Sequence, residues 1–142
     1  VWLPQDRLSL SLRFTQGKQF VVLFTEAVAA MAHGGGFLPS YANRSDAVCR
    51  TFPHRVGPLP KKPPTAYLKD GQLFFDTIVF TPEALRHLIA ETGPRQIMMG
   101  TDYPFPWTST EVDLILNTPG LSDDDRVAIL GGTAAKLLGL DS

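Results

Sequence analysis

Hydrophobic residues in the middle of the chain follow a strand, helix, strand pattern. The stretch LFFDTIVF, residues 73–80, is apolar apart from one acidic residue, which is typical of a strand buried on both faces. An apolar stripe at helical spacing follows, between start signals at Thr81 and Pro82 and a stop signal at Gly93. Residues 96–100, QIMMG, predict a second buried strand. Such a βαβ unit requires parallel pairing, so the pattern predicts an α/β fold.

The first half of the chain is less regular. Residues 8–14, LSLSLRF, alternate as a half-buried strand does, and residues 20–24 are rich in strand formers. The alanine-rich residues 26–32 fit either a helix or a short strand that ends at His33. Residues 50–66 contain five prolines and predict a long loop, because proline removes a backbone donor and fixes φ.

Helices are expected to close the chain. The pattern predicts one helix at about 110–117 and a second at 122–130, where Ser122 can cap a first turn that holds three aspartates. A short third helix at 133–138 is expected after a break at the GG pair. With no repeat and no self-sufficient half, residues 1–142 are interpreted as a single domain with the 50–66 loop inside it.

Composition narrows the class of protein. The chain has 142 residues, 44% of them apolar and 19% charged, and a net charge of -1. No run of positive charge suggests a nucleic-acid or membrane partner. Cys49 is the only cysteine, which excludes an internal disulfide and a cysteine-rich zinc site and favours a reducing compartment. The longest apolar stretch is too short to span a bilayer and no signal peptide is visible, so a cytoplasmic location is expected.

Two stretches follow strand ends, where parallel α/β folds gather functional residues. Asp102 comes just after the 96–100 strand, before a proline and aromatic wall, and could bind a metal or accept a proton. It could equally be a turn-forming aspartate that bonds its own backbone. His33 lies before three glycines and could be catalytic or a satisfied structural group. Asp76, inside a predicted buried strand, must be paired or hydrogen-bonded if it is ionised.

Two further histidines carry less signal. His87 falls on the polar side of its predicted helix, and His54 lies in the proline-rich loop. Both are interpreted as solvated surface groups.

Four segments together resemble a known family. They are AHGGGFLPSYANR, LFFDTIVFTPEALRHLI, QIMMGTDYPFPW and GLSDDDRVAILGGTAAKLLGL. In order and spacing, over roughly residues 30–140, they resemble the C-terminal part of the amidohydrolase-related family, in the branch of aminocarboxymuconate-semialdehyde and resorcylate-type decarboxylases. The resemblance implies the last βα units of a metal-dependent (β/α)8 barrel.

Roles for four residues follow from the resemblance. It implies that Asp102 binds a divalent metal, with zinc as the expected ion, and that His33 orients or deprotonates a metal-bound water. A bound ion would polarise the substrate, and a histidine can move a proton near neutral pH. Phe105 would pack on the substrate, and Arg44 would bind a substrate carboxylate in a neighbouring subunit's site, as a guanidinium suits.

The family's remaining metal ligands, an HxH pair and a further histidine, have no counterpart in this sequence. A whole barrel needs about 250 residues, so the chain is expected to be a partial barrel. We therefore expect the C-terminal part of a decarboxylase or hydrolase for a small carboxylated substrate, with weak activity or none, and whether the chain is an enzyme stays open. Two alternatives are a non-catalytic barrel remnant that self-associates through its strand edges, and a small-molecule binder using the aromatic residues 103–107.

Overall fold

A parallel three-stranded sheet lies at the centre of the protein. The computed structural model describes residues 11–14, 20–23, 28–55, 60–107 and 110–140. The sheet strands are β3 (Ala29–Met31), β4 (Leu73–Asp76) and β5 (Ile97–Met98), with β4 in the middle. Phe75 pairs with Met31 on one side and with Ile97 on the other. Residues 26–32 therefore contribute a short strand, and not the alternative helix, over their described part.

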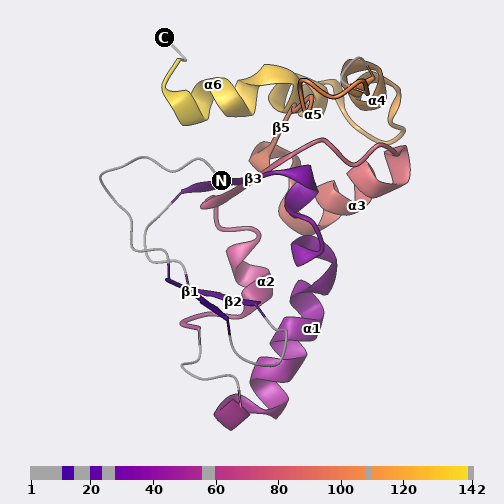
Figure 1. Ribbon diagram of the computed structural model, residues 1–142. Helices are drawn as coiled ribbons and strands as arrows, with labels where there is room; N and C mark the ends of the chain where they lie inside the picture. The colour runs from indigo at the N-terminus through magenta and orange to yellow at the C-terminus, as the bar shows by residue number, and fades with distance from the viewer. Residues whose placement is uncertain (1–10, 15–19, 24–27, 56–59, 108–109, 141–142) are drawn as a thin grey trace.

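Helices connect and flank these strands. The first half has α1 (Leu38–Thr51), the 3-10 turns η1 (His33–Gly35) and η2 (Pro53–Arg55), and α2 (Pro64–Tyr67). The second half has α3 (Pro82–Thr92), the turn η3 (Pro94–Gln96), α4 (Glu111–Asn117), α5 (Asp123–Val127), a π-helical turn η4 (Ala128–Gly132) and α6 (Thr133–Leu138). In Figure 1, α1 runs toward one end of the molecule and α4, α5 and α6 gather at the other.

The two strands of the predicted βαβ unit are shorter than expected. The strand predicted at 73–80 ends at Asp76, because the Asp76 carboxylate accepts the N–H of Ile78 at 3.1 Å and turns the chain. The strand predicted at 96–100 is reduced to Ile97–Met98. Gln96 precedes it in η3, where its buried amide donates to the carbonyls of Leu68 and Leu73.

The helix between these strands was predicted correctly. Thr81 caps α3 by accepting the N–H of Ala84 at 3.2 Å, Pro82 is the first helical residue, and Gly93 is the C-cap. By contrast, α1 has no hydrogen-bonding side chain at its N-cap, and only Pro39 and Ala42 of it are buried. A helix with so weak a local pattern depends on packing against its neighbours.

The predicted break at the GG pair is wrong. Ser122 caps α5 as expected, in a capping box with Asp125, but the helical path continues through η4 into α6. Gly132 keeps helical angles, with φ of -60° and ψ of -40°. A wider π turn thus absorbs the two glycines, and the Ile129 carbonyl inside it accepts the N–H of Met99 at 2.8 Å.

The other elements complete the picture. β1 (Ser11–Phe14) and β2 (Phe20–Leu23) pair in an antiparallel hairpin, which agrees with the strand patterns there; residues 8–10 and 24 lie outside the described residues. The 50–66 segment holds the end of α1, η2 and the start of α2 among its described residues. No helix in the described part of the chain has the length and apolar character to cross a membrane.

The hydrophobic core lies between the sheet and the helices. Phe75, Leu85, Ile97, Ile115 and Ile129 are fully buried in one cluster. Their elements come from most of the chain, so the core fixes where the strand ends lie. Burial of side chains of this size stabilises the fold by about 1.5–3 kcal/mol each.

Candidate active site

His33 and Asp102 meet at the carboxyl end of the sheet. His33 begins η1 directly after β3, and Asp102 follows β5 by four residues. Because β3 and β5 flank β4 in a parallel sheet, the segments that follow β3 and β5 leave the sheet at the same edge. The Nε2 atom of His33 lies 3.5 Å from the Oδ1 atom of Asp102. The His33 side chain is 64% exposed and that of Asp102 is 21% exposed, so solvent reaches the pair from the histidine side.

Asp76 holds the turn that presents His33. Its Oδ2 atom accepts the backbone N–H of His33 at 2.9 Å, and its Oδ1 atom accepts that of Gly34 at 2.8 Å. The same Oδ1 atom accepts the N–H of Ile78 at 3.1 Å. Three backbone N–H groups thus donate to this carboxylate, which gives Asp76 a structural role in the described site.

Gly34 and Gly35 are required by space and by backbone conformation. A Cβ atom on Gly34 would lie 2.6 Å from Cγ1 of Val79, and one on Gly35 would lie 2.7 Å from the ring of Phe75. Their φ angles are +58° and +76°, a region that suits glycine. The glycines therefore let the turn pack directly against the loop after β4 and the core, while His33 stays exposed.

A second contact ties the ends of β4 and β5 together. The Gly100 N–H donates to the hydroxyl of Thr77 at 3.2 Å. A Cβ atom on Gly100 would lie 2.8 Å from Cβ of Asp76, so only glycine allows this approach. Asp102 lies two residues after Gly100. Its position therefore depends on the packing of Gly100 against Asp76, the residue that also holds His33.

The site residues have unusual backbone angles. His33 has a φ of 55°, Asp102 of 56° and Phe80 of 63°. Histidine and aspartate tolerate this left-handed region better than most residues, but a bulky Phe there is an outlier. Strain of this kind persists where surrounding contacts determine the conformation, and it concentrates at functional sites.

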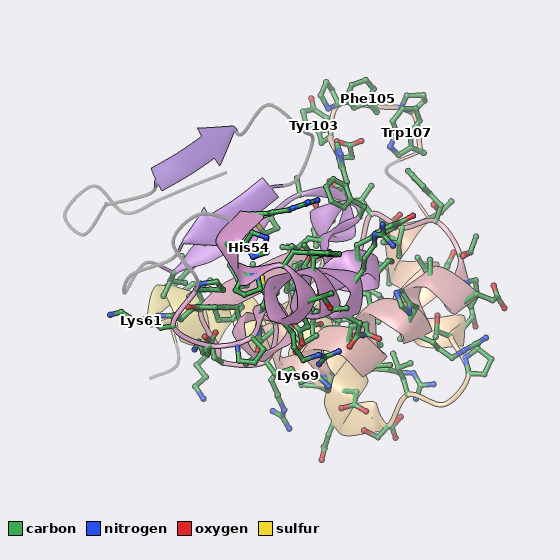
Figure 2. All side chains as sticks on the ribbon, turned by 90° about the horizontal axis from the view of Figure 1, so that it is seen from below. His54, Lys61, Lys69, Tyr103, Phe105 and Trp107 are labelled. Atoms are coloured by element: carbon green, nitrogen blue, oxygen red, sulfur yellow. The ribbon has the colours of Figure 1, made fainter. Side chains whose placement is uncertain are left out.

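Trp107 contacts Asp102 and packs against two further aromatic rings. Phe105 stacks on Trp107 with ring centroids 4.8 Å apart and an interplanar angle of 2°, and Phe80 meets Trp107 edge-on at 6.0 Å. The indole N–H of Trp107 donates to Oδ2 of Asp102 at 3.1 Å. Figure 2 shows Tyr103, Phe105 and Trp107 together on the loop after β5, far from His54.

Sequence reasoning placed Trp107 only within a general aromatic wall and did not single out Phe80. Phe80 could have been identified from its position, because it lies at the end of a predicted strand, at the same edge of the sheet.

A buried acid lies beneath this site. Glu111 is 1% exposed, and neither of its carboxylate oxygens has a hydrogen-bond partner among the described residues. Burial raises the pKa of Glu111; the Thr77 hydroxyl, which bonds Gly100, partly opposes this increase, and the negative charge of Asp76 adds to it. The native structure therefore favours the protonated form of Glu111. Sequence reasoning missed this residue.

The structure does not bring the other polar candidates to the pair. Arg44 is exposed in the second turn of α1 and makes no ion pair with another described residue. His54 is exposed in η2, and His87 is exposed on α3, where its Nε2 atom lies 2.9 Å from the hydroxyl of Ser40. The prediction that both histidines lie at the surface is confirmed.

Cys49 is also separate from the site. It lines a hollow of about 280 Å³ between α1 and the proline-rich segment. Burial raises the pKa of its thiol, and the charge of Asp46 adds to the increase. A thiol of this kind is a poor nucleophile at neutral pH, because the thiolate is the reactive form.

The donor atoms at the site do not complete a metal centre. Among the described residues, no group of three or more His, Cys, Asp or Glu side chains is arranged to hold an ion. Asp102 and His33 supply two donors, and Asp76 is occupied by backbone N–H groups. A catalytic zinc takes three protein ligands, so the described residues alone do not fit one.

Known proteins similar to this chain include decarboxylases. The chain is 34% identical over 122 residues to the 2-amino-3-carboxymuconate-6-semialdehyde decarboxylase of Caenorhabditis elegans, covering 85% of this chain. It is 32% identical over 111 residues to that of Dictyostelium discoideum, covering 78%. In each case the match spans 30% of the relative's length.

Solved structures agree with this likeness. The 5-carboxyvanillate decarboxylase of Sphingomonas paucimobilis superposes with a TM-score of 0.66 at 28% identity, covering 76% of this chain and 32% of that one. A dihydroxybenzoic acid decarboxylase of Polaromonas sp. JS666, crystallised with manganese and 2-nitroresorcinol, gives 0.68 at 26% identity, covering 80% and 34%. These neighbours are (β/α)8 barrels, so the predicted fold class, a partial barrel of parallel strands and flanking helices, is confirmed.

The family itself follows from a match along most of the chain. A family model described as amidohydrolase matches residues 16–140. The chain belongs to the amidohydrolase family.

Proposed function

We propose that this chain forms the C-terminal part of the active site of a decarboxylase for small aromatic or muconate-type carboxylates. The observation that supports it is the approach of His33 and Asp102, 3.5 Å apart, at the carboxyl end of the sheet. Its relatives include decarboxylases of carboxyvanillate, dihydroxybenzoate and carboxymuconate semialdehyde. The chain spans about a third of their length, so we expect it alone to have weak activity or none.

His33 and Asp102 have the chemistry that such a reaction needs. Loss of CO₂ leaves an electron pair on carbon, which must take up a proton. We propose that His33 is the acid and base that handles this proton, with Asp102 beside it to orient the ring. Phe105 would pack on the substrate ring, and Arg44, exposed on α1, would reach a carboxylate in a neighbouring subunit's site.

A divalent ion belongs to this proposal for the complete fold, with Asp102 as one ligand. One structural neighbour carries manganese, and zinc was our expectation from the sequence. Since the described residues offer two suitable donors, we expect the isolated chain to retain no stoichiometric ion after dialysis.

Manganese added to the chain tests where an ion goes. We expect millimolar Mn²⁺ to broaden the NMR signals of the His33 ring first, because Mn²⁺ is paramagnetic and Asp102 lies beside that ring. In Asp102→Asn the broadening of His33 should disappear. The exposed rings of His54 and His87 are internal controls in the same spectrum, and preferential broadening there, or of His33 in Asp102→Asn, would contradict the proposal.

A second candidate function is a non-catalytic chain that self-associates. Among the described strands, β3 and β5 are the outer strands of the three-stranded sheet, and each has one edge without a strand partner. Open edges invite pairing with another chain. On this basis we keep the prediction of a homo-oligomer.

Sedimentation measures this directly. We expect a species heavier than the 15.6 kDa monomer at micromolar concentration, because pairing would satisfy the edge groups of β3 and β5. A compact monomer over the whole concentration range would contradict self-association and leave the active-site proposal untouched. A cytoplasmic location and the absence of nucleic-acid and membrane partners also stay predictions.

A further inference from the structure

We propose that Trp107 is the positioning residue of Asp102, and that Phe80 holds the Trp107 indole in place. This inference rests on the proposed role of Asp102. It concerns two residues to which neither the sequence nor the family match gave an individual role.

The two oxygens of the Asp102 carboxylate have different neighbours. Its Oδ2 atom accepts the Trp107 indole N–H at 3.1 Å, while its Oδ1 atom lies 3.5 Å from Nε2 of His33. An indole nitrogen can only donate a hydrogen bond, so the carboxylate is always the acceptor in this contact. With one oxygen bound, the carboxylate cannot turn about its last side-chain bond without losing that hydrogen bond, and the other oxygen stays toward His33.

Two aromatic rings hold the Trp107 indole in place. Phe105 covers one face of it in a parallel stack, and Phe80 meets it edge-on at 6.0 Å with an interplanar angle of 88°. These two geometries are the ones that aromatic pairs prefer. Phe80 comes from the loop after β4, whereas Phe105 and Trp107 come from the loop after β5. The indole is therefore fixed from two neighbouring loops of the same sheet edge.

Phe80 has an unusual backbone conformation. Its φ of 63° is rare for so large a side chain, and its ring remains 55% exposed. Burial in the core does not account for that conformation. The ring contact with Trp107 is the packing interaction that the conformation provides, which points to a role at the site and not in the core.

The arrangement predicts how substitutions propagate. Trp107→Phe keeps an aromatic ring between Phe80 and Phe105 but removes the donor to Asp102. Asp102 should then rotate, and the neutral His33 ring should lose its preference for the tautomer with a proton on Nε2, which faces the carboxylate. Phe80→Ala keeps the donor and should cause a smaller change in the same direction.

The experiment is ¹H–¹⁵N NMR on the full chain. Two tryptophans give two indole signals, and the Trp107 signal is identified by its loss in Trp107→Phe. Asp102→Asn should shift this signal. Long-range correlations of His33 at fixed pH should show the tautomer change in Trp107→Phe. The matched control is Tyr103→Phe, on the same loop and 84% exposed, which should alter neither signal.

Stability and metal binding separate the possible outcomes. If Trp107 has only a structural role, Trp107→Phe should lower the unfolding midpoint and leave the His33 tautomer unchanged, and that result would overturn the inference. A Trp107 indole signal that does not shift in Asp102→Asn would also overturn it. If Mn²⁺ broadens His33 in the wild type, Trp107→Phe should need about tenfold more Mn²⁺ for the same effect, as is typical when a residue supporting a ligand is removed. If the two NMR couplings are present and Mn²⁺ does not bind, the positioning role stands and the expected binding of Mn²⁺ at Asp102 in this chain fails.

Discussion

Replacing Asp76 with alanine should lower the free energy of unfolding by about 3 kcal/mol or more. The substitution leaves the N–H groups of His33, Gly34 and Ile78 without the carboxylate that accepts them at 2.8–3.1 Å. Hydrogen bonds to a charged acceptor each contribute about 1.5–3 kcal/mol, and Gly34 is buried where water does not readily replace the acceptor. Urea unfolding followed by circular dichroism measures the loss.

Two variants define what the loss means. Asp76→Asn keeps one carbonyl oxygen and should lose less stability, so it remains usable if Asp76→Ala does not fold. Asp124→Ala removes an exposed carboxylate from the first turn of α5 and should change the unfolding free energy by about 0.5 kcal/mol at most. A loss below about 1 kcal/mol in Asp76→Ala would mean that the turn finds other partners for its donors.

Asp76 also shows where sequence reasoning reached its limit. Its neighbours in the chain predict a buried strand, and the strand does begin at Leu73. Its carboxylate also accepts hydrogen bonds from a turn 42 and 43 residues earlier, and no local pattern predicts these contacts. By contrast, the starts of α3 and α5 were predictable because Thr81 and Ser122 accept backbone N–H groups three residues away.

The candidate site was predictable in its outline and not in its details. Sheet topology alone places residues that follow parallel strands at one edge, which is why His33 and Asp102 could be expected together. Ring contacts such as that of Phe80 with Trp107 depend on the path of two loops. α1 was missed because its apolar pattern is weak and its stability comes from packing.

The face of α4 that is buried could not be read from its apolar residues. Val112 and Leu116 are 44% and 46% exposed, whereas Glu111 and Ile115 are buried. The spacing of Glu111, four residues before Ile115, was compatible with burial, but hydrophobicity favoured Val112 for the core. Only the tertiary fold reveals that a carboxyl group takes this place.

Glu111→Gln should stabilise the protein at neutral pH by about 1–3 kcal/mol, because folding of the wild type must then either bury a charged carboxylate or take up a proton. The folded state raises the pKa of Glu111, so the native protein binds this proton more tightly than the unfolded chain does. The wild type therefore has its full stability below the unfolded pKa of roughly 4.3 and loses this contribution as the pH rises through the folded pKa. Glutamine has nearly the same shape and does not ionise.

The measurable quantity is the difference in unfolding free energy between Glu111→Gln and wild type across pH 4 to 8. We expect a difference near zero or slightly negative at the acidic end, because the buried amide also lacks partners among the described residues. The difference should increase in favour of the variant above the unfolded pKa, where the unfolded wild type ionises and the native state still holds its proton. Asp113→Asn, an exposed carboxylate in the same first turn of α4, is the matched control, and it should show a small change of opposite sign since the helix N-terminus favours negative charge. A pH-independent difference for Glu111→Gln would mean that folding does not change the pKa of Glu111, and it would contradict the predicted cost of the buried charge.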